Sequence, residues 1–365
     1  MRHVVVVGQT PPPLSGQAIM IERMLGAKWD GLTLHHVRMG FMTTMDQRGK
    51  FSLRKIFHLF EIIARILWLR VRTGATILYY PPCNAPKSAI YRDLIIVGTT
   101  RWFFKKLVFH FHAAGISETY PTLRPKEQRL ARWIMRRPDL TITSSAFNPP
   151  DGPYLEGRRN AIVPLGIPDE FGSMERKPWS GGPLRILFIG LMNGTKGEGF
   201  LLEAVGELAG KGHECTIELA GTFQSPAYRA QFFERVQQLG LESKVEHLGL
   251  ITGEAKRKAF QEADLFCFPS FFESESFGVV LLEAMQAGLP VVATRWRGIQ
   301  SAVKHGETGI LVATRDPKAL AIALEQFLCD PVLLQRFGEA GRAYFLEQFQ
   351  LSRHLEGLER ELLNV

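Results

Sequence analysis

The sequence predicts an α/β fold of two domains, each with a doubly wound parallel sheet, and a cleft between them. Short apolar runs alternate with longer segments of helical period along the chain, which is typical of parallel strands joined by helices. The length of 365 residues is that of about two domains. A stretch rich in Pro and Gly, 164–183, reads as the linker. We expect a first domain over residues 1–173, a second over 174–345, and a C-terminal helix over 346–365 that could pack back on the first domain.

Each half of the chain contains six apolar runs of strand length, and several are continuously apolar, as in parallel strands buried on both faces. The expected strands are 4–8, 32–37, 77–80, 107–111, 140–143, 161–163, 185–189, 215–220, 245–248, 265–268, 291–293 and 310–312. Helices are expected between them, for instance over 199–208, 227–239 and 279–287. The chain reads as helical from 317 onward, with Asp316 and Asp330 as capping residues. Ligands in such sheets bind outside the carboxyl ends of the strands.

The positive charge lies in the first half of the chain. Lys and Arg number 44 against 36 Asp and Glu, a net charge of +8. Residues 1–173 carry 24 basic and 12 acidic residues, a balance of +12, whereas residues 174–365 carry 20 and 24, a balance of −4. The first domain is therefore expected to meet an anionic partner or surface.

The cysteines and apolar runs indicate the compartment. The four cysteines form no C-x-x-C pair, which speaks against a disulfide framework or a zinc ribbon and favours a reducing cytosol. The apolar run 4–7 is too short for a signal-peptide core, and no run reaches the ~18 residues of a spanning helix. We expect a cytoplasmic protein, with peripheral contact at the inner face of the membrane as a further hypothesis.

Two carboxylates in the segment 271–285 form the strongest candidate site. Glu275 is expected in a loop after the strand 265–268, Gly278 at the start of a helix, and Glu283 inside that helix. Glu283 is the only charged residue between Phe277 and Thr294, and a lone buried carboxylate needs a partner. That partner is either the hydroxyl groups of a ligand or an arginine such as Arg295. The helix start at Gly278 offers free amides that suit a diphosphate.

The pattern Glu275-x7-Glu283 resembles the E-x7-E signature of the retaining family 4 glycosyltransferases. Three more segments occur in the same order along the chain as in that family, two of them before this pattern and one after it. They are Phe188-Ile189-Gly190 with Lys196-Gly197 and 201–204, Ala263-Asp264 through Pro269-Ser270, and 306–309. The resemblance implies a GT-B fold of two Rossmann-like domains with a nucleotide-sugar in the cleft. It also implies sugar transfer from a nucleoside-diphosphate sugar to an acceptor hydroxyl, with retention, no fixed metal and no cofactor beyond this co-substrate.

The resemblance also implies roles for single residues. Glu283 would accept hydrogen bonds from the ribose hydroxyls, and Glu275 would contact the donor sugar. Backbone amides of Phe277, Gly278 and Val279 would face the donor, and Lys196 would hold its diphosphate through a charge-assisted bond. Where the family usually has an arginine, this chain has Leu191. Lys256, Arg257 or Arg295 are candidates to replace that missing cation.

Two positions in the first domain complete the expected site. Ser15-Gly16 lies in the turn 11–17, where the family commonly shows two glycines, so Gly16 is expected beside the donor or the acceptor. The turn matches neither G-x-G-x-x-G nor a P-loop, which disfavours a NAD or ATP site. His112, at the end of the strand 107–111, resembles the family's active-site histidine. His110 is expected to be structural and to point to the opposite face of the sheet. The expected catalytic residues are thus His112, Glu275 and Lys196.

One helical segment bears on the acceptor. Arg54, His58, Glu61, Arg65 and Arg72 recur at helical spacing opposite a stripe that includes Phe57, Phe60, Ile63 and Leu67. The segment 101–106 mixes aromatic and basic residues. Two interpretations remain open. The helical segment is either a core helix with one polar face or part of a surface that meets an anionic membrane. The acceptor is expected to be a cell-surface glycan or a lipid-linked precursor.

The sequence gives less support to functions other than sugar transfer. No nucleic-acid recognition module is evident. No two of the nine Asp residues form a metal-binding D-x-D pair. The alternatives that stay open are a sugar-nucleotide epimerase of the same fold and a non-catalytic sugar-nucleotide or membrane-binding protein.

Overall fold

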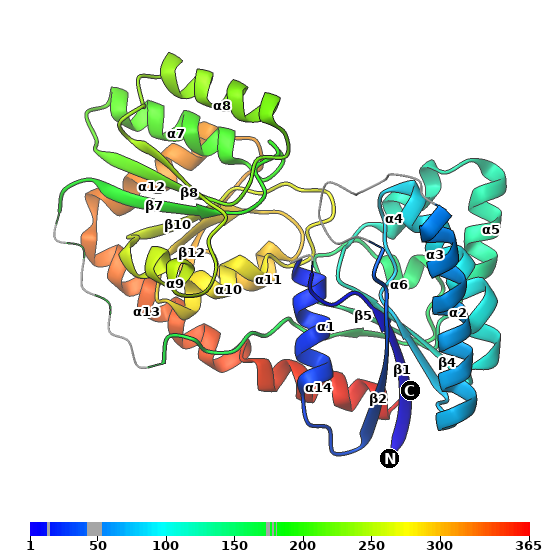
Figure 1. The fold of residues 1–365 in the computed structure, drawn as a ribbon. Helices are drawn as coiled ribbons and strands as arrows, with labels where there is room; N and C mark the ends of the chain where they lie inside the picture. Colours follow the sequence, from blue (N-terminus) through cyan, green and yellow to red (C-terminus); the bar gives the residue numbers. More distant parts are fainter. Residues whose placement is uncertain (13–14, 42–52, 173–175, 177–178, 180) are drawn as a thin grey trace. The chain divides into compact units, whose positions relative to one another are not determined.

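The computed structural model describes residues 1–12, 15–41, 53–172, 176, 179 and 181–365, and the side chains of residues 53–55 are not described (Figure 1). The described chain forms two compact units. Unit 1 contains Met1–Pro164 together with Ser352–Val365, and unit 2 contains Leu165–Leu351. The boundary expected between residues 173 and 174 falls at residues outside the described part. The structure instead divides the chain after Pro164 and after Leu351.

Unit 1 is built on a six-stranded sheet in which every neighbouring pair is parallel. The order is β2-β1-β3-β4-β5-β6. The strands are β1 (Arg2–Gly8), β2 (Leu32–Arg38), β3 (Ile77–Tyr80), β4 (Lys106–Phe111), β5 (Leu140–Thr143) and β6 (Asn160–Ile162). Val4–Val7 of β1 and all four residues of β3 are buried, as expected for strands covered on both faces. The direction of the sheet order reverses between β1 and β3, which is the topological switch point of such a fold.

Helices cover both faces of this sheet (Figure 1). One core contains side chains of α2 (Leu53–Thr73), α3 (Lys87–Thr100) and α5 (Pro125–Met135). The other contains side chains of α1 (Gly16–Gly26) and α14 (Leu351–Leu363). In α14, Leu358 and Leu362 are fully buried, so the end of the chain packs into unit 1. The remaining elements are η2 (Arg101–Phe103), α4 (Ile116–Thr119), η3 (Tyr120–Thr122) and α6 (Asp151–Tyr154). Among the described helices, none is both long and apolar enough to cross a membrane.

Unit 2 repeats the architecture with the strand order β12-β11-β10-β7-β8-β9, again parallel throughout. Its strands are β7 (Leu184–Ile189), β8 (Cys215–Ala220), β9 (Val245–Gly249), β10 (Leu265–Phe268), β11 (Val291–Thr294) and β12 (Gly309–Val312). Its helices are α7 (Glu198–Gly210), α8 (Pro226–Gln238), α9 (Gly253–Glu262), α10 (Val279–Gln286), α11 (Ile299–Ala302), α12 (Pro317–Cys329) and α13 (Pro331–Gln348). Here the order reverses between β7 and β10, which puts the expected ligand site at the loops that follow these two strands.

The predicted α/β class with two parallel sheets is confirmed, and each expected strand overlaps an observed one. The carboxylates of Asp316 and Asp330 cap α12 and α13, as expected. Asp316 accepts from the Ala319 amide at 2.9 Å, and Asp330 accepts from the Val332 amide at 3.1 Å. These caps satisfy amides that have no partner within the helix.

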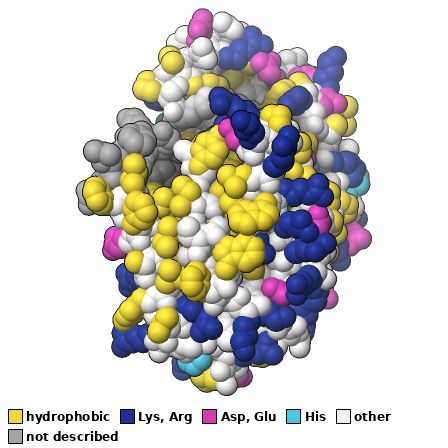
Figure 2. All heavy atoms as spheres, turned by 90° about the vertical axis from the view of Figure 1, so that its right-hand side faces the viewer, with side chains coloured by type: hydrophobic (Ala, Val, Ile, Leu, Met, Phe, Trp, Pro, Cys, Tyr) yellow, Lys and Arg dark blue, Asp and Glu magenta, His cyan; other side chains and the backbone are white. Residues whose placement is uncertain are grey.

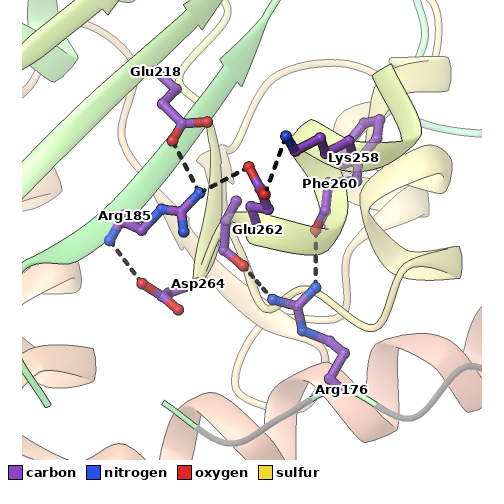
Figure 3. A network of polar contacts seen from close by, with 8 residues as sticks. Arg176, Arg185, Glu218, Lys258, Phe260, Glu262 and Asp264 are labelled. Carbon is purple, nitrogen blue, oxygen red and sulfur yellow. Dashed lines mark hydrogen bonds and ion pairs between the residues drawn. The ribbon is translucent and has the colours of Figure 1, made fainter. Parts of the chain in front are cut away.

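The start of the stretch expected as a linker is a packed part of unit 2. Ile167 forms a β-bridge with Gln350, and the Arg342 guanidinium donates to both carboxylate oxygens of Asp169 at 2.7 and 2.6 Å. Arg176 donates to the backbone carbonyls of Phe260 and Ala263, where α9 ends (Figure 3). Burial lowers the pKa of Arg176 to about 10. These contacts tie Ile167, Asp169 and Arg176 to the rest of unit 2.

Candidate functional site

Lys196 and Glu275 meet at the switch point of unit 2. Lys196 lies in the turn between β7 and α7, and Glu275 lies in the loop between β10 and α10. The Lys196 ammonium is 2.5 Å from the Glu275 carboxylate, and both side chains are largely buried. The same ammonium lies 4.6 Å from the centre of the Phe272 ring. Two residues that are 79 positions apart thus form a charged pair, because both strands end at the same edge of the sheet.

The two loops that carry this pair are in direct contact. The Phe271 amide donates to the Thr195 carbonyl at 2.9 Å. Gly197 has a φ of +87°, and a Cβ placed there would lie 2.1 Å from the Pro269 carbonyl oxygen. Only glycine satisfies both the left-handed backbone and this close approach. Packing therefore requires glycine at position 197, directly after Lys196.

Glu198 supports the turn, although it was not among the residues expected at the site. It is fully buried at the start of α7. Its carboxylate accepts from the Gly194 amide at 2.6 Å and from the Tyr228 hydroxyl at 2.7 Å. A carboxylate at the first position of a helix is favoured by the helix dipole. The position of Glu198 directly after Lys196-Gly197 is the sequence feature that could have identified it.

Glu283 pairs with Lys256 of α9. The Lys256 ammonium lies 2.6 and 2.7 Å from the two Glu283 carboxylate oxygens. The side chains are 28% and 20% exposed, so ligand groups could reach them. The expected alternative partner, Arg295, is an exposed residue. Of the cations named as substitutes for the arginine missing at Leu191, Lys256 is the one that the structure brings to a predicted site residue.

The start of α10 is shaped by Gly278. This residue has a φ of +78° and precedes the first helical residue, Val279. The Phe277 side chain is buried against Phe349, with ring centroids 5.6 Å apart, so the side chain belongs to the core. The loop that precedes Gly278 is held in place by Trp296, which follows β11. The Trp296 indole donates to the Phe272 carbonyl at 2.9 Å.

In unit 1, Gly16 is the first residue of α1. The Ser15 hydroxyl caps this helix by accepting from the Ala18 amide at 3.2 Å. A Cβ at Gly16 would meet nothing within 4 Å. The glycine is thus an open position directly after the turn that follows β1. Pro13 and Leu14 of the same turn lie outside the described residues.

His112 follows β4 and belongs to a cluster of aromatic and histidine rings. Its ring centroid lies 4.2 Å from that of His110, and His110 lies 6.2 Å from His354 of α14. A hydrogen bond of 2.5 Å joins the Tyr79 hydroxyl to His110 Nδ1. The expectation that His110 and His112 point to opposite faces is therefore wrong. Residues two apart in a strand point to the same face.

Burial controls the protonation of this cluster. It lowers the pKa of His112 to about 3, with a smaller contribution from His354. It lowers the pKa of His354 to about 4, against the opposing effect of the 2.7 Å hydrogen bond from its Nδ1 to the Pro164 carbonyl. The pKa of His110 also lies well below its usual range because of burial. All three rings are therefore neutral at pH 7.

Within the described residues, no three His, Cys, Asp or Glu side chains converge in a way that could hold a metal ion.

Comparison with known proteins finds similarity mainly to the second unit. Residues 171–344 match the family described as "Glycosyl transferases group 1". An uncharacterized glycosyltransferase of Methanocaldococcus jannaschii is 34% identical over 145 residues, which are 40% of this chain and 36% of that protein. The D-inositol 3-phosphate glycosyltransferase of Corynebacterium diphtheriae is 36% identical over 158 residues, 42% of this chain and 36% of the relative. The chain thus matches about a third of the length of these relatives.

Solved structures resemble the whole chain in fold. The sucrose-phosphate synthase of Thermosynechococcus elongatus has a TM-score of 0.74 and 19% identity, with full coverage of both chains. Anabaena HepE, solved in complex with UDP, has a TM-score of 0.75 and 17% identity, again with full coverage of both. The two-domain α/β fold is therefore GT-B-like, and over residues 171–344 the chain is similar to the glycosyl transferases group 1 family.

Proposed function

We propose that this protein transfers a sugar from a nucleoside-diphosphate sugar to an acceptor hydroxyl, with retention of configuration and without a metal. The observation that carries the proposal is the pair of Lys–Glu contacts in unit 2. Lys196 meets Glu275 at the switch point, and Lys256 meets Glu283 on the adjoining helices α9 and α10. Two cations and two carboxylates provide for the two recognition tasks of such a donor, since cations bind its phosphates and carboxylates accept from its hydroxyls.

In this proposal the donor replaces the contacts within each pair. Its diphosphate binds the Lys196 ammonium, so the Glu275 carboxylate becomes free to accept hydrogen bonds from the sugar. The ribose hydroxyls donate to Glu283, and Lys256 supplies the positive charge that Leu191 does not. Backbone amides of Phe277, Gly278 and Val279 face the phosphates at the start of α10. As the bond to the diphosphate breaks, negative charge develops on its oxygens, and these preplaced donors stabilise it.

Unit 1 would supply the acceptor side. The neutral His112 can donate or accept one hydrogen bond with a hydroxyl of the transferred sugar. Gly16 leaves the backbone open at the start of α1. A cell-surface glycan or lipid-linked precursor remains the proposed acceptor, and the balance of +12 over residues 1–173 suits one that carries phosphate. A relative named phosphatidyl-myo-inositol mannosyltransferase, from Mycobacterium leprae, is 41% identical over 29% of this chain.

The proposal is tested in two steps. A panel of nucleoside-diphosphate sugars is screened by thermal shift, because a ligand at ~100 times its Kd adds about 2.7 kcal/mol of stability. Release of nucleoside diphosphate is then measured with and without glycan and lipid-linked acceptors. Acceptor-dependent release supports transfer. Conversion of the donor without acceptor indicates an epimerase, and binding without turnover indicates a non-catalytic protein.

Substitutions distinguish the proposed roles of Glu283 and Glu275. Glu283→Ala should weaken UDP binding by about 10- to 100-fold, the effect of losing hydrogen bonds to a charged group. Glu275→Gln should mainly lower kcat. The matched controls are Glu254→Ala on α9, where the side chain is 80% exposed, and Glu273→Gln in the loop that contains Glu275, where the residue is exposed. Isothermal titration with UDP and steady-state kinetics give the two readouts. Unchanged binding in Glu283→Ala together with unchanged turnover in Glu275→Gln would refute the site assignment.

A further inference from the structure

The helices on one face of the unit 1 sheet expose an unusual number of large hydrophobic side chains. Within the described part of the chain, eleven of nineteen such side chains lie on α2, α3, η2 and α5. On α2 they form one stripe, because their spacing follows the 3.6-residue turn. The stripe contains Phe57 (75% exposed), Phe60 (63%), Trp68 (51%) and Val71 (84%). The opposite side of α2 is buried through Ile62 and Ile66. The helix is therefore apolar on two faces, and only one of them is covered by unit 1.

Neighbouring elements continue this exposed stripe. The helix α3 contacts both α2 and α5. Trp102 of η2 and Trp133 of α5 are each more than half exposed, and their rings lie 5.7 Å apart. We call the exposed side of α2, α3, η2 and α5 the outer aromatic face. Figure 2 shows hydrophobic side chains gathered on this side of unit 1, with Lys and Arg along their flank.

The outer aromatic face is also strongly basic. The sequences of its four elements contain eleven Lys and Arg against three Asp and Glu. Of the acidic residues, Asp93 is fully buried and pairs with Arg92 at 2.7 Å. Arg132 pairs with Glu156 at 2.9 Å. These pairs still leave a clear excess of basic side chains on the four elements. The Arg72 guanidinium lies 4.7 Å from the Trp68 ring centre, and that of Arg101 lies 5.0 Å from the Trp102 ring centre. Positive charges are thus interleaved with the exposed aromatic rings.

We propose that the outer aromatic face docks on an anionic lipid bilayer. Aromatic side chains prefer the boundary between lipid headgroups and acyl chains, and nearby Arg and Lys meet the lipid phosphates. Arginine and aromatic residues also occur together at protein interfaces, but an excess of one sign of charge beside a continuous apolar stripe favours an extended anionic surface. Nucleic acid would match the charge but not the apolar stripe of α2. The proposal goes beyond sugar transfer and uses no residue of the donor site, so it stands or falls separately from the proposed function.

Vesicle flotation tests the docking. Wild-type protein is mixed with vesicles of equal parts phosphatidylcholine and phosphatidylglycerol, or with phosphatidylcholine alone. We expect it to float with the anionic vesicles only, and to dissociate as salt rises from about 0.1 M to 1 M, where the screening length falls from ~10 Å to ~3 Å. Emission from Trp68, Trp102 and Trp133 should shift to the blue on binding. Absence of binding to the anionic vesicles at the lower salt would overturn the proposal.

Matched pairs of variants show whether this face is responsible. The double variant Phe57→Ser/Phe60→Ser removes half of the stripe. Its control is Leu250→Ser/Val332→Ser, which alters two side chains of unit 2 that are 69% and 71% exposed. Arg65→Glu with Arg72→Glu reverses two exposed charges, and its control is Lys318→Glu with Arg336→Glu in unit 2.

Both face variants should bind anionic vesicles at least about tenfold more weakly. Each basic residue near such a surface contributes about fivefold, and each phenylalanine buried in the interface contributes about tenfold or more. Both controls should bind as wild type does. All substituted side chains are exposed, so the melting temperature checks that folding is intact. Equal binding by face and control variants would contradict the proposal. So would a dimer that depends on Phe57 and Phe60 and excludes vesicles, because a second copy would then cover the face.

Discussion

At the scale of single residues, the histidines of unit 1 link folding to pH. His354 comes from α14, whereas His110 and His112 come from the end of β4, so the cluster joins the last helix to the sheet. The rings are held neutral because burial disfavours the imidazolium form. In the unfolded chain, each ring would be exposed and would protonate near pH 6.5.

The expected consequence is a loss of stability in mild acid. Because the folded pKa of His354 is lowered to about 4, only the unfolded state takes up this proton between pH 6.5 and 4. The stabilisation is complete above pH 6.5 and is lost as the pH falls toward 4. At pH 5.5 one such histidine should lower the free energy of unfolding by about 1 kcal/mol.

Urea unfolding measured from pH 8 to pH 5 checks this prediction. In His354→Gln the glutamine cannot take up the proton, and its amide can still donate to the Pro164 carbonyl. The slope of unfolding free energy against pH should therefore be shallower in this variant than in wild type, even if its stability at pH 8 is lower. Equal slopes would show that His354 is not the group that titrates.

Single residues also show what the sequence could predict about the site. Glu283 is conspicuous in the sequence because it is the one charge between Phe277 and Thr294, whereas the roles predicted for Glu275 and Lys196 depend on the resemblance of their motifs to a known family. The contact between Lys256 and Glu283 could not be singled out, because it joins two helices whose relative rotation depends on packing. The clustering of His110 with His112 could have been predicted, since strand periodicity puts residues two apart on one face.

At the scale of elements, the turn between β7 and α7 fixes the position of Lys196. It contacts the loop after β10 through the Phe271 amide and through the absence of a side chain at Gly197. The carboxylate of Glu198 holds the same turn from the helix side. Any change that separates these loops should move the Lys196 ammonium away from Glu275.

Gly197→Ala should therefore destabilise the protein and weaken UDP binding together. The left-handed backbone costs about 1 kcal/mol for alanine, and the added Cβ would collide with the Pro269 carbonyl. The control is Gly199→Ala in α7, where a Cβ meets nothing within 4 Å and alanine should be neutral or stabilising. Thermal melting and UDP titration give the readouts. A Gly197→Ala protein that melts and binds as wild type does would show that the close approach is unimportant.

Elements also mark the limit of what a sequence pattern can predict. The strands were predictable because runs such as Ile77–Tyr80 are apolar without interruption, and both faces of a parallel sheet are covered. In α2 the pattern was ambiguous. Phe57, Phe60, Ile63 and Leu67 were grouped as one stripe, yet Phe57 and Phe60 are exposed while Ile63 packs against the core. A periodic pattern shows that a helix has an apolar stripe, but tertiary packing decides which stripe is covered.

At the scale of the whole molecule, the two units differ in how the chain builds them. Unit 2 is one continuous segment, Leu165–Leu351, whose ends meet in the bridge between Ile167 and Gln350. Unit 1 needs both ends of the chain, because α14 completes one face of its sheet. Leu358 and Leu362 are fully buried there, and the Glu359 carboxylate accepts from the Gly31 amide at 2.9 Å.

This difference predicts opposite behaviour when the units are produced separately. A chain of residues 165–351 should fold cooperatively and bind UDP, because every unit 2 group proposed to contact the donor lies within it. A chain of residues 1–164 lacks α14 and should be unfolded or aggregated. Burying a leucine contributes about 2–5 kcal/mol relative to alanine, and two such losses approach the 5–15 kcal/mol that a domain has in total.

The control for the second chain is residues 1–164 joined through a Gly/Ser linker to residues 352–365, which restores α14 and should restore a cooperative transition. Circular dichroism with thermal and urea unfolding distinguishes the three chains. If residues 1–164 melt cooperatively at the same temperature with and without the added helix, α14 does not stabilise unit 1. If residues 165–351 fold but do not bind UDP, the donor site either needs groups from unit 1 or is wrongly assigned, and UDP titration of full-length Glu283→Ala decides between these outcomes.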